Sequence, residues 1–127
     1  MKALLPKFKF KGAPTVINAP INLSRAFIEM GFSTAFNKTI KSKDTLIFVN
    51  NKTEFIGFLN KNLDDVETDS VLWFAYPKGT SGVKTDINRD VLRETAEAFG
   101  ITAVTAISIN EIWSALRFRP IDIVGEK

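Results

Sequence analysis

The stretch with the most concentrated polar chemistry is VLWFAYPKGTSGVK, residues 71 to 84, which begins as an apolar run and ends as a glycine-rich loop. Its glycines can adopt the positive φ that turns successive N–H groups to one side, while Lys78 adds a charge and the two hydroxyl residues add donors. Such a loop suits a phosphate or a carboxylate. The GxxxxGK[ST] spacing of a P-loop is missing, so a connector without a ligand is the alternative interpretation. We expect Lys78 to be exposed just past its strand, and in a connector it would pair with a carboxylate such as Asp86.

Two residue types that usually perform acid–base and nucleophilic chemistry are missing, since the chain has no histidine and no cysteine. Ser-His and Cys-His nucleophile systems, disulfides and cysteine-based zinc sites are therefore excluded. No close pair of titratable residues forms a catalytic unit, so we expect no catalytic residues and no cofactor. The alternative is an enzyme that uses Lys78, Tyr76 or a carboxylate such as Asp86 on a phosphorylated or carboxylated substrate.

The densest acidic stretch comprises Asp64, Asp65, Glu67 and Asp69. It lies between a predicted helix and a predicted strand, where a solvated connector is the expected structure. A cation site needs several oxygens that converge on one point, and this spacing does not indicate one. We therefore expect no bound metal.

Length and composition indicate one soluble domain over residues 1–127, with an N-terminal arm (1–13) and a C-terminal tail (120–127). The chain is 45% hydrophobic and 24% charged, and no apolar run is long enough to span a bilayer. Lysines at positions 7, 9 and 11 interrupt the start, so it does not resemble a signal peptide. We expect a cytoplasmic location and no membrane partner.

The net charge of +3 favours anionic partners without a nucleic-acid signature. Phenylalanine alternates with basic residues in FKFK and RFR, which would suit bases stacked on aromatic rings. The alternative is a strand with phenylalanine facing the core and the charges facing water. We expect an anionic small molecule or a protein as partner, and no nucleic acid; the oligomeric state stays open.

Apolar runs separated by helical stretches predict an alternation of strands and helices. Helices are expected over INLSRAFIEMG, over the segment that begins with the capping pair Asn51 and Glu54, and over NRDVLRETAEAF, which Asp86 or Asn88 can cap. A short strand near 35–40 is a further candidate. The five main strands are predicted near residues 15–18, 45–50, 71–76, 102–109 and 113–119.

Connection lengths predict how these strands pair. A helix-length crossover between 45–50 and 71–76 requires parallel strands, and the short link around Asn110 and Glu111 requires an antiparallel hairpin. The expected fold is α/β: a small three-layer sandwich, Rossmann-like, with a mostly parallel sheet and a C-terminal antiparallel hairpin.

Parallel sheets bind ligands beyond the carboxyl ends of their strands, so the candidate site lies there. In WSALRFRP, alternation places Trp113 and Arg117 on one face, where they would form the wall of a crevice. Alternatively, Trp113 packs under a helix and the arginines pair with carboxylates across the sheet. The candidate ligand-binding residues are Asn18, Asn50, Tyr76, Lys78, Thr80, Ser81, Trp113, Ser114 and Arg117.

The segments NAP, DTLIFVN, LWFAYPKGTSGVKTDINRD and WSALRFRP, in this order, resemble a bacterial family known only as a domain of unknown function. The resemblance covers nearly the whole chain and implies a bacterial cytoplasmic domain without an assigned activity. The strand order also resembles the later half of a class I methyltransferase. A methyltransferase has a glycine-rich turn after its first strand, whereas this chain has Asn18-Ala19-Pro20, so we expect no S-adenosylmethionine binding.

Overall fold

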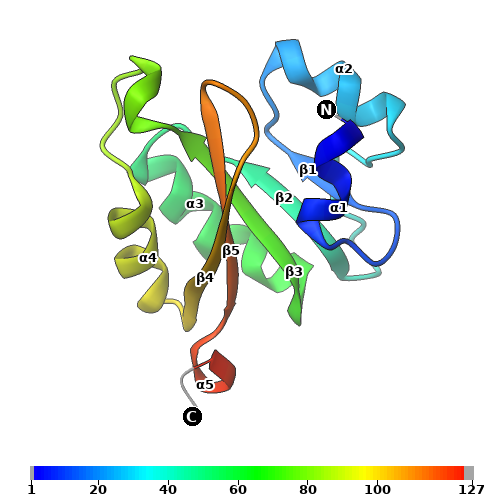
Figure 1. Cartoon of the computed structure of the whole chain (residues 1–127). Helices are drawn as coiled ribbons and strands as arrows, with labels where there is room; N and C mark the ends of the chain where they lie inside the picture. Colours follow the sequence, from blue (N-terminus) through cyan, green and yellow to red (C-terminus); the bar gives the residue numbers. More distant parts are fainter. Residues whose placement is uncertain (1, 125–127) are drawn as a thin grey trace.

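One five-stranded mixed sheet organises the computed structural model, which describes residues 2–124 (Figure 1). Its order is β1-β2-β3-β5-β4. The strands are β1 (Thr15–Ile17), β2 (Ser42–Phe48), β3 (Val66–Pro77), β4 (Ile101–Ser108) and β5 (Trp113–Pro120). All five predicted strands are present, and the parallel pairing of 45–50 with 71–76 is confirmed.

The prediction of a mostly parallel sheet is wrong, because β1, β2 and β3 pair in parallel while β3 with β5 and β5 with β4 pair antiparallel. The strands of the hairpin do not follow their order in the sequence, since β5 lies next to β3 and β4 forms the edge of the sheet. Burial explains this order: β5 carries large apolar side chains such as Phe118, whereas β4 is exposed over Val104–Ala106. A strand with apolar residues directed to both faces is more stable inside the sheet than at its edge.

Three of the helices match the predicted ones: α2 (Ile21–Glu29), α3 (Lys52–Asn62) and α4 (Arg89–Glu97). Asn51 caps α3 by accepting from the Glu54 backbone N–H at 2.8 Å, and Asn88 caps α4 by accepting from Val91 at 2.9 Å. The remaining helical segments are η1 (Lys2–Leu4), α1 (Leu5–Phe8), η2 (Leu63–Asp65), η3 (Gly79–Ser81) and α5 (Ile121–Val124).

Three differences from the sequence expectations concern the connections and the ends of the chain. No strand forms over residues 35–40; the extra pairing is an isolated bridge between Thr15 and Ser33. The expected tail begins inside β5 and continues as α5, while residues 125–127 lie outside the described part of the chain. The N-terminal arm contains η1 and α1, which the sequence reading missed.

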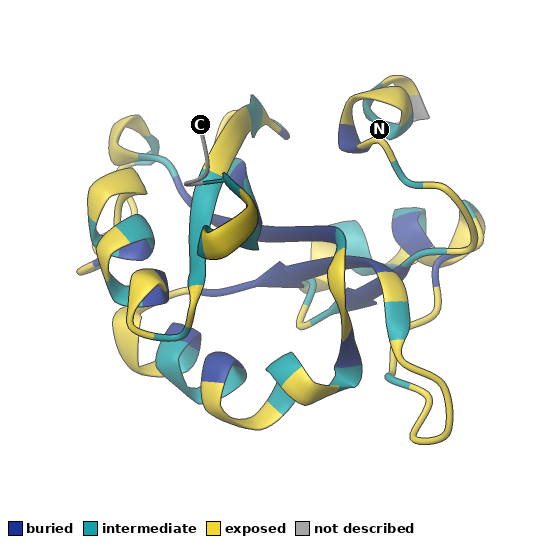
Figure 2. Ribbon diagram, turned by 90° about the horizontal axis from the view of Figure 1, so that it is seen from below, coloured by how far each residue is buried: buried dark blue, intermediate teal, exposed yellow. Residues whose placement is uncertain are grey.

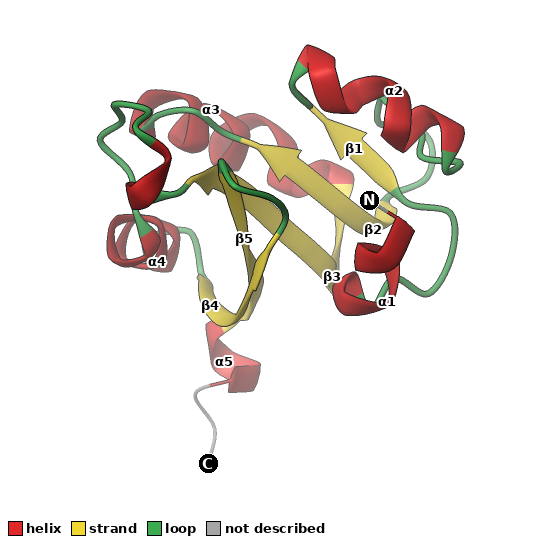
Figure 3. Cartoon of the chain, turned by 45° about the horizontal axis from the view of Figure 1, so that its top comes forward, coloured by secondary structure: helices red, strands yellow, loops and turns green. Residues whose placement is uncertain are grey.

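Side chains alternate along β3 between two buried clusters, one on each face of the sheet. Figure 2 shows the sheet strands coloured mostly as buried, with exposed residues on the outer helices and loops. Phe74 and Tyr76 join a cluster with residues of α3 and α4, whereas Trp73 and Ala75 join a cluster with Phe8 of α1 and residues of α2. Figure 3 shows the two pairs of helices on opposite sides of the sheet. The fold is therefore α/β with helices packed on a mixed sheet.

The N-terminal arm is part of the core. Phe8 is 1% exposed and meets Trp73 edge to face, with 5.6 Å between ring centroids, while the Trp73 indole N–H donates to the Phe8 carbonyl at 2.9 Å. The FKFK segment is not a strand: Phe8 ends α1, and Lys9 adopts a left-handed conformation. Pro6 in the first helical turn favours this helical start, which period-two alternation alone does not reveal.

A buried carboxylate fastens the arm to the start of β2. Asp44 is 4% exposed and accepts from the backbone N–H groups of Lys11, at 2.8 Å, and Gly12, at 3.0 Å. Two charge-assisted hydrogen bonds satisfy this carboxylate in a place where an unpaired one would be costly.

Candidate functional site

The predicted site lies at the end of the sheet where β1, β2 and β3 finish, here called the carboxyl edge. The loop after β3 and the turn between β4 and β5 lie at this same end (Figure 3). They are joined directly, because the Lys78 backbone N–H donates to the Ile112 carbonyl at 2.7 Å. This hydrogen bond holds the backbone of Lys78 in place at the start of the loop.

The ammonium group of Lys78 has a neutral partner. Its Nζ donates to the Ser108 hydroxyl at 2.6 Å, and it forms no ion pair with any carboxylate in residues 2–124. Asp86, the counter-ion expected if the loop were only a connector, instead accepts from the Lys52 backbone N–H at 2.8 Å. The side chain was expected to be exposed, yet Lys78 is half-buried. Its charge thus stays without a bonded counter-charge.

Ser81 shapes the loop from within. Its hydroxyl donates to the Lys78 carbonyl at 2.7 Å and accepts from the Val83 backbone N–H at 3.1 Å. Gly82 follows at φ +81°, a left-handed conformation that glycine adopts without strain. Thr80 is exposed and has no hydrogen bond to another described residue through its hydroxyl. Thr80 and Lys78 are therefore the loop side chains best able to meet a ligand.

Both predicted asparagines hold strand ends in place. Asn18 has a left-handed backbone, with φ +63°. Its side-chain amide donates to the Phe48 carbonyl at 2.9 Å and so connects the end of β1 to β2. Asn50 donates through its backbone and its amide to Glu54 at 2.7 and 3.0 Å, and its carbonyl accepts from Thr85 at 2.6 Å. These groups already have partners within the fold.

The two aromatic candidates are buried on opposite faces of the sheet. Tyr76 is 7% exposed in the cluster with α3 and α4, whereas Trp113 is 8% exposed in the other cluster, 5.0 Å from Phe48 between ring centroids. Ser114 of β5 pairs with Tyr76 of β3 on one side and with Ser108 of β4 on the other. The fold brings these residues to one edge but separates the aromatic rings.

Arg117 lies further along β5 from this edge, opposite Trp73. It is half-buried, and its Nε is buried without a hydrogen-bond partner among the described residues. Trp113 and Arg117 do point to one face of the sheet, as the alternation predicted, but Trp113 is packed into the core there.

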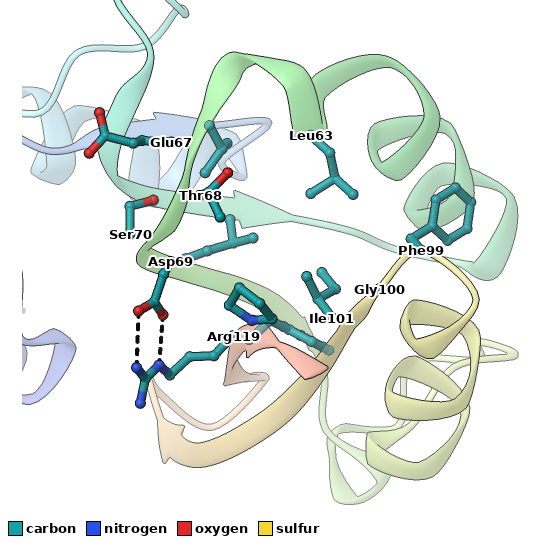
Figure 4. Close-up of a pocket in the computed structure, with 13 residues that line it drawn as sticks. Leu63, Glu67, Thr68, Asp69, Ser70, Phe99, Gly100, Ile101 and Arg119 are labelled. Carbon is teal, nitrogen blue, oxygen red and sulfur yellow. Dashed lines mark hydrogen bonds and ion pairs between the residues drawn. The ribbon is translucent and has the colours of Figure 1, made fainter. Parts of the chain in front are cut away.

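A second polar region lies at the other end of the sheet, here called the amino end, where the parallel strands begin. A cleft of about 220 Å³ opens between the start of β3, the end of β5 and the loop after α4 (Figure 4). We call it the Asp69–Arg119 cleft, after the ion pair that Figure 4 shows at its rim. Its apolar wall consists of Leu63, Val66, Leu72, Phe99, Ile101, Phe118 and Pro120.

An irregular stretch of β3 forms the polar side of this cleft. Ser42 of β2 pairs with Val66 and Asp44 pairs with Val71, so residues 67–70 of β3 stand opposite the single residue Lys43 and bulge out of the ladder. Asp69 in this bulge has φ +56°, a left-handed conformation uncommon outside glycine. Bulges and such strained residues often occur beside functional sites.

The ion pair spans 50 positions of the sequence. Arg119 donates from Nε to Asp69 Oδ1 at 2.9 Å and from Nη2 to Oδ2 at 3.1 Å, and both side chains are about one-third exposed. The hydrogen bond from Arg119 is the main cause that lowers the pKa of Asp69 below its ordinary value, and it raises the pKa of Arg119. Arg117 and Lys11 lower the pKa of Asp69 further through their charges.

Sequence reasoning treated Asp69 as part of a solvated connector and missed this cleft. Two acidic residues of that stretch have different partners: Asp69 bonds to Arg119, whereas Asp65 accepts from Asn62 at 2.8 Å and meets Lys38 at 3.4 Å. The Asn62 bond is the main cause that lowers the Asp65 pKa. Within residues 2–124 no three carboxylates gather in a group able to hold a metal ion. No local pattern joins Asp69 to Arg119, since only the β3–β5 pairing brings them together.

Comparison with known proteins leaves these sites to be interpreted from their own chemistry, since no family model, no curated protein and no solved structure matches the chain. None of the helices in the described part of the chain has the length and apolar character needed to cross a bilayer.

Proposed function

We propose that this chain is a non-catalytic module that binds an anionic small ligand at the carboxyl edge through Lys78. One observation supports this most directly: the Lys78 ammonium bonds to a neutral hydroxyl, Ser108, and to none of the carboxylates in residues 2–124. A connector lysine was expected to pair with Asp86, which bonds to the Lys52 backbone instead.

The arrangement suits exchange of the Lys78 partner. A neutral acceptor can give way to an anionic oxygen, because an anion attracts the ammonium with a full charge, whereas a hydroxyl offers only a dipole. Ser108 holds Nζ beside the loop, and the exposed Thr80 hydroxyl and the glycine-containing backbone offer further donors. A phosphate or a carboxylate has the acceptors that such a site requires.

The same proposal includes a three-layer, Rossmann-like arrangement, supported by the two core clusters on opposite faces of the sheet. In such folds, ligands generally bind beyond the carboxyl ends of the parallel strands. The sequence resemblance described above supports a bacterial, cytoplasmic setting. A protein partner with an acidic side chain at Lys78 stays within this proposal, and nucleic acid stays outside it.

We favour binding over catalysis because of where Tyr76 lies. The enzyme alternative uses Lys78, Tyr76 or a carboxylate such as Asp86. Tyr76 is 7% exposed and belongs to the core cluster with α3 and α4, and Asp86 accepts from the Lys52 backbone N–H. A ligand at the loop would meet Lys78 and Thr80 first.

Thermal melts test this proposal. Phosphate or a nucleotide at millimolar concentration should raise the Tm of the wild type above that in sodium chloride of equal ionic strength. Lys78→Ala should weaken binding by about 1–3 kcal/mol, the range for a hydrogen bond to a charged group. Lys84→Ala is the matched control, since it removes the same charge from an exposed position of the same loop.

Two results would contradict the proposal. A wild-type Tm that phosphate and nucleotides leave unchanged would make the loop a connector. Equal loss of binding in Lys84→Ala and Lys78→Ala would indicate a diffuse charge effect and no site at Lys78.

A further inference from the structure

We propose that the Asp69–Arg119 cleft is a second binding site, which accepts a small carboxylic acid with its carboxylate at Arg119 and its apolar body against the opposite wall. This site lies at the amino end of the sheet and is independent of the anion site proposed at Lys78. Three features support it: the size of the cleft, the donors at its rim that bond to no other described residue, and the way in which Asp69 holds Arg119.

The size and the apolar lining of the cleft indicate how large the apolar part of the ligand is. Leu63, Phe99 and Ile101 face the ion pair from the far wall in Figure 4. An apolar cavity of about 150 Å³ holds a benzene molecule. The cleft, at about 220 Å³, therefore has room for one ring or a branched chain together with a polar head group.

The free hydrogen-bond donors at the cleft indicate the chemistry of the ligand's polar head group. A guanidinium group has five N–H donors, and Asp69 receives bonds from only Nε and Nη2 of Arg119. The remaining donors bond to no other described residue. Ser70, which also lines the cleft, has a buried Oγ without a partner among the described residues. A carboxylate offers only acceptors, so it complements this set better than an amine or an amide does.

Charge at the rim favours the same head group. The positive side chains of Lys11 and Arg117 lie close enough to Asp69 to lower its pKa. Glu67 belongs to the bulge, but Figure 4 shows its carboxylate directed away from Arg119. A ligand carboxylate beside Arg119 thus meets more positive than negative charge.

Asp69 acts here as a positioning residue. Its two bonds fix the plane of the Arg119 guanidinium, so that the free donors keep one direction before a ligand arrives. The left-handed backbone at Asp69 is the conformation in which the bulge presents this carboxylate at the rim.

Titration of the full chain with phenylacetate, followed by the amide NMR signals, tests the proposal. Phenylacetate should shift the signals of residues 63–72 and 99–101 in a saturable way. A dissociation constant on the order of 1 mM is expected for a ligand of about ten non-hydrogen atoms. Phenylacetamide, which has the same shape without the charge, should bind at least about tenfold more weakly.

Two variants and one control locate the effect. Arg119→Gln should weaken phenylacetate binding about tenfold or more and remove the preference over phenylacetamide. Arg93→Gln, the same change at a half-exposed arginine of α4 outside the cleft, should bind like the wild type. Because Arg119→Gln also releases Asp69, Thr68→Phe serves as a second variant: it fills the cleft from an exposed rim position and should abolish binding while the Tm stays unchanged.

Several outcomes would overturn the inference. These are equal affinity for phenylacetate and phenylacetamide, wild-type affinity in folded Thr68→Phe or in folded Arg119→Gln, and no saturable shift at about ten times the expected dissociation constant. Shifts confined to residues 78–84 would instead assign the carboxylate to the Lys78 site.

Discussion

The carboxyl edge and the amino end of this sheet use their polar side chains in different ways. At the carboxyl edge, Asn18 and Asp86 bond to backbone groups, and Lys78 bonds to a hydroxyl. At the amino end, Asp69 and Arg119 bond to each other across two strands and leave a cleft beside them. At the carboxyl edge the polar side chains bond to groups of the fold itself. At the amino end a cleft remains, and Arg119 at its rim has donors that bond to no other described residue.

The comparison shows that the position of a cleft depends on strand register as well as on strand direction. The rule that ligands bind beyond the carboxyl ends assumes that adjacent loops diverge there. In this chain the loop after β3 is joined to the hairpin turn, because the Lys78 backbone N–H donates to the Ile112 carbonyl. At the amino end, the bulge at 67–70 lifts β3 out of its ladder and creates the space.

The largest effect should come from the carboxylate that fastens the N-terminal arm at the amino end. Asp44→Ala leaves the Lys11 and Gly12 amides without their acceptor and should lower the free energy of unfolding by about 2–3 kcal/mol. Urea denaturation measures this, with the exposed Asp64→Ala as control. A loss no greater than that of the control would mean that the arm contributes little to stability.

The Asp69–Arg119 pair should have a smaller effect on stability. Single substitutions Asp69→Asn and Arg119→Gln and their double variant should give a coupling free energy of up to about 1 kcal/mol, since exposed pairs contribute little and bidentate geometry favours the upper part of that range. A coupling indistinguishable from zero would remove the role of Asp69 in holding Arg119.

Acid should weaken the same pair. The folded-state pKa of Asp69 lies below its ordinary value of 3.8, so the pair stabilises the fold fully above that value and loses this contribution as the pH falls through the folded-state pKa. The difference in Tm between wild type and Asp69→Asn should therefore be present at neutral pH and shrink below pH 3.8. A difference that persists in strong acid would point to backbone strain at Asp69 as its source.

The smallest effect is expected at the carboxyl edge. Ser108→Ala removes the neutral partner of Lys78 and should change the free energy of unfolding by no more than about 0.5 kcal/mol, because a half-buried lysine can turn to water. Thermal melts give the change in stability, and phosphate titration should still show binding at Lys78. A large loss of stability would make this end as dependent on its polar contacts as the amino end.

Local patterns predicted the elements well. Apolar runs located the five strands, helical spacing located α2, α3 and α4, and the Asn51–Glu54 spacing located a cap that the structure contains. The hairpin between β4 and β5 followed from its short connection. The short N-terminal helix was missed, because four residues carry too little periodicity to separate a helix from a strand.

The sequence by itself determined the composition of the strands, the residue types available for chemistry and the placement of Lys78 after a buried strand. Tertiary structure alone decided that β5 lies inside the sheet, that Tyr76 and Trp113 face opposite ways, and that the cleft opens at the amino end. The physical reason is distance along the chain. Spacing reports neighbours within a turn or a strand, whereas Asp69 meets Arg119 only after β3 and β5 have paired.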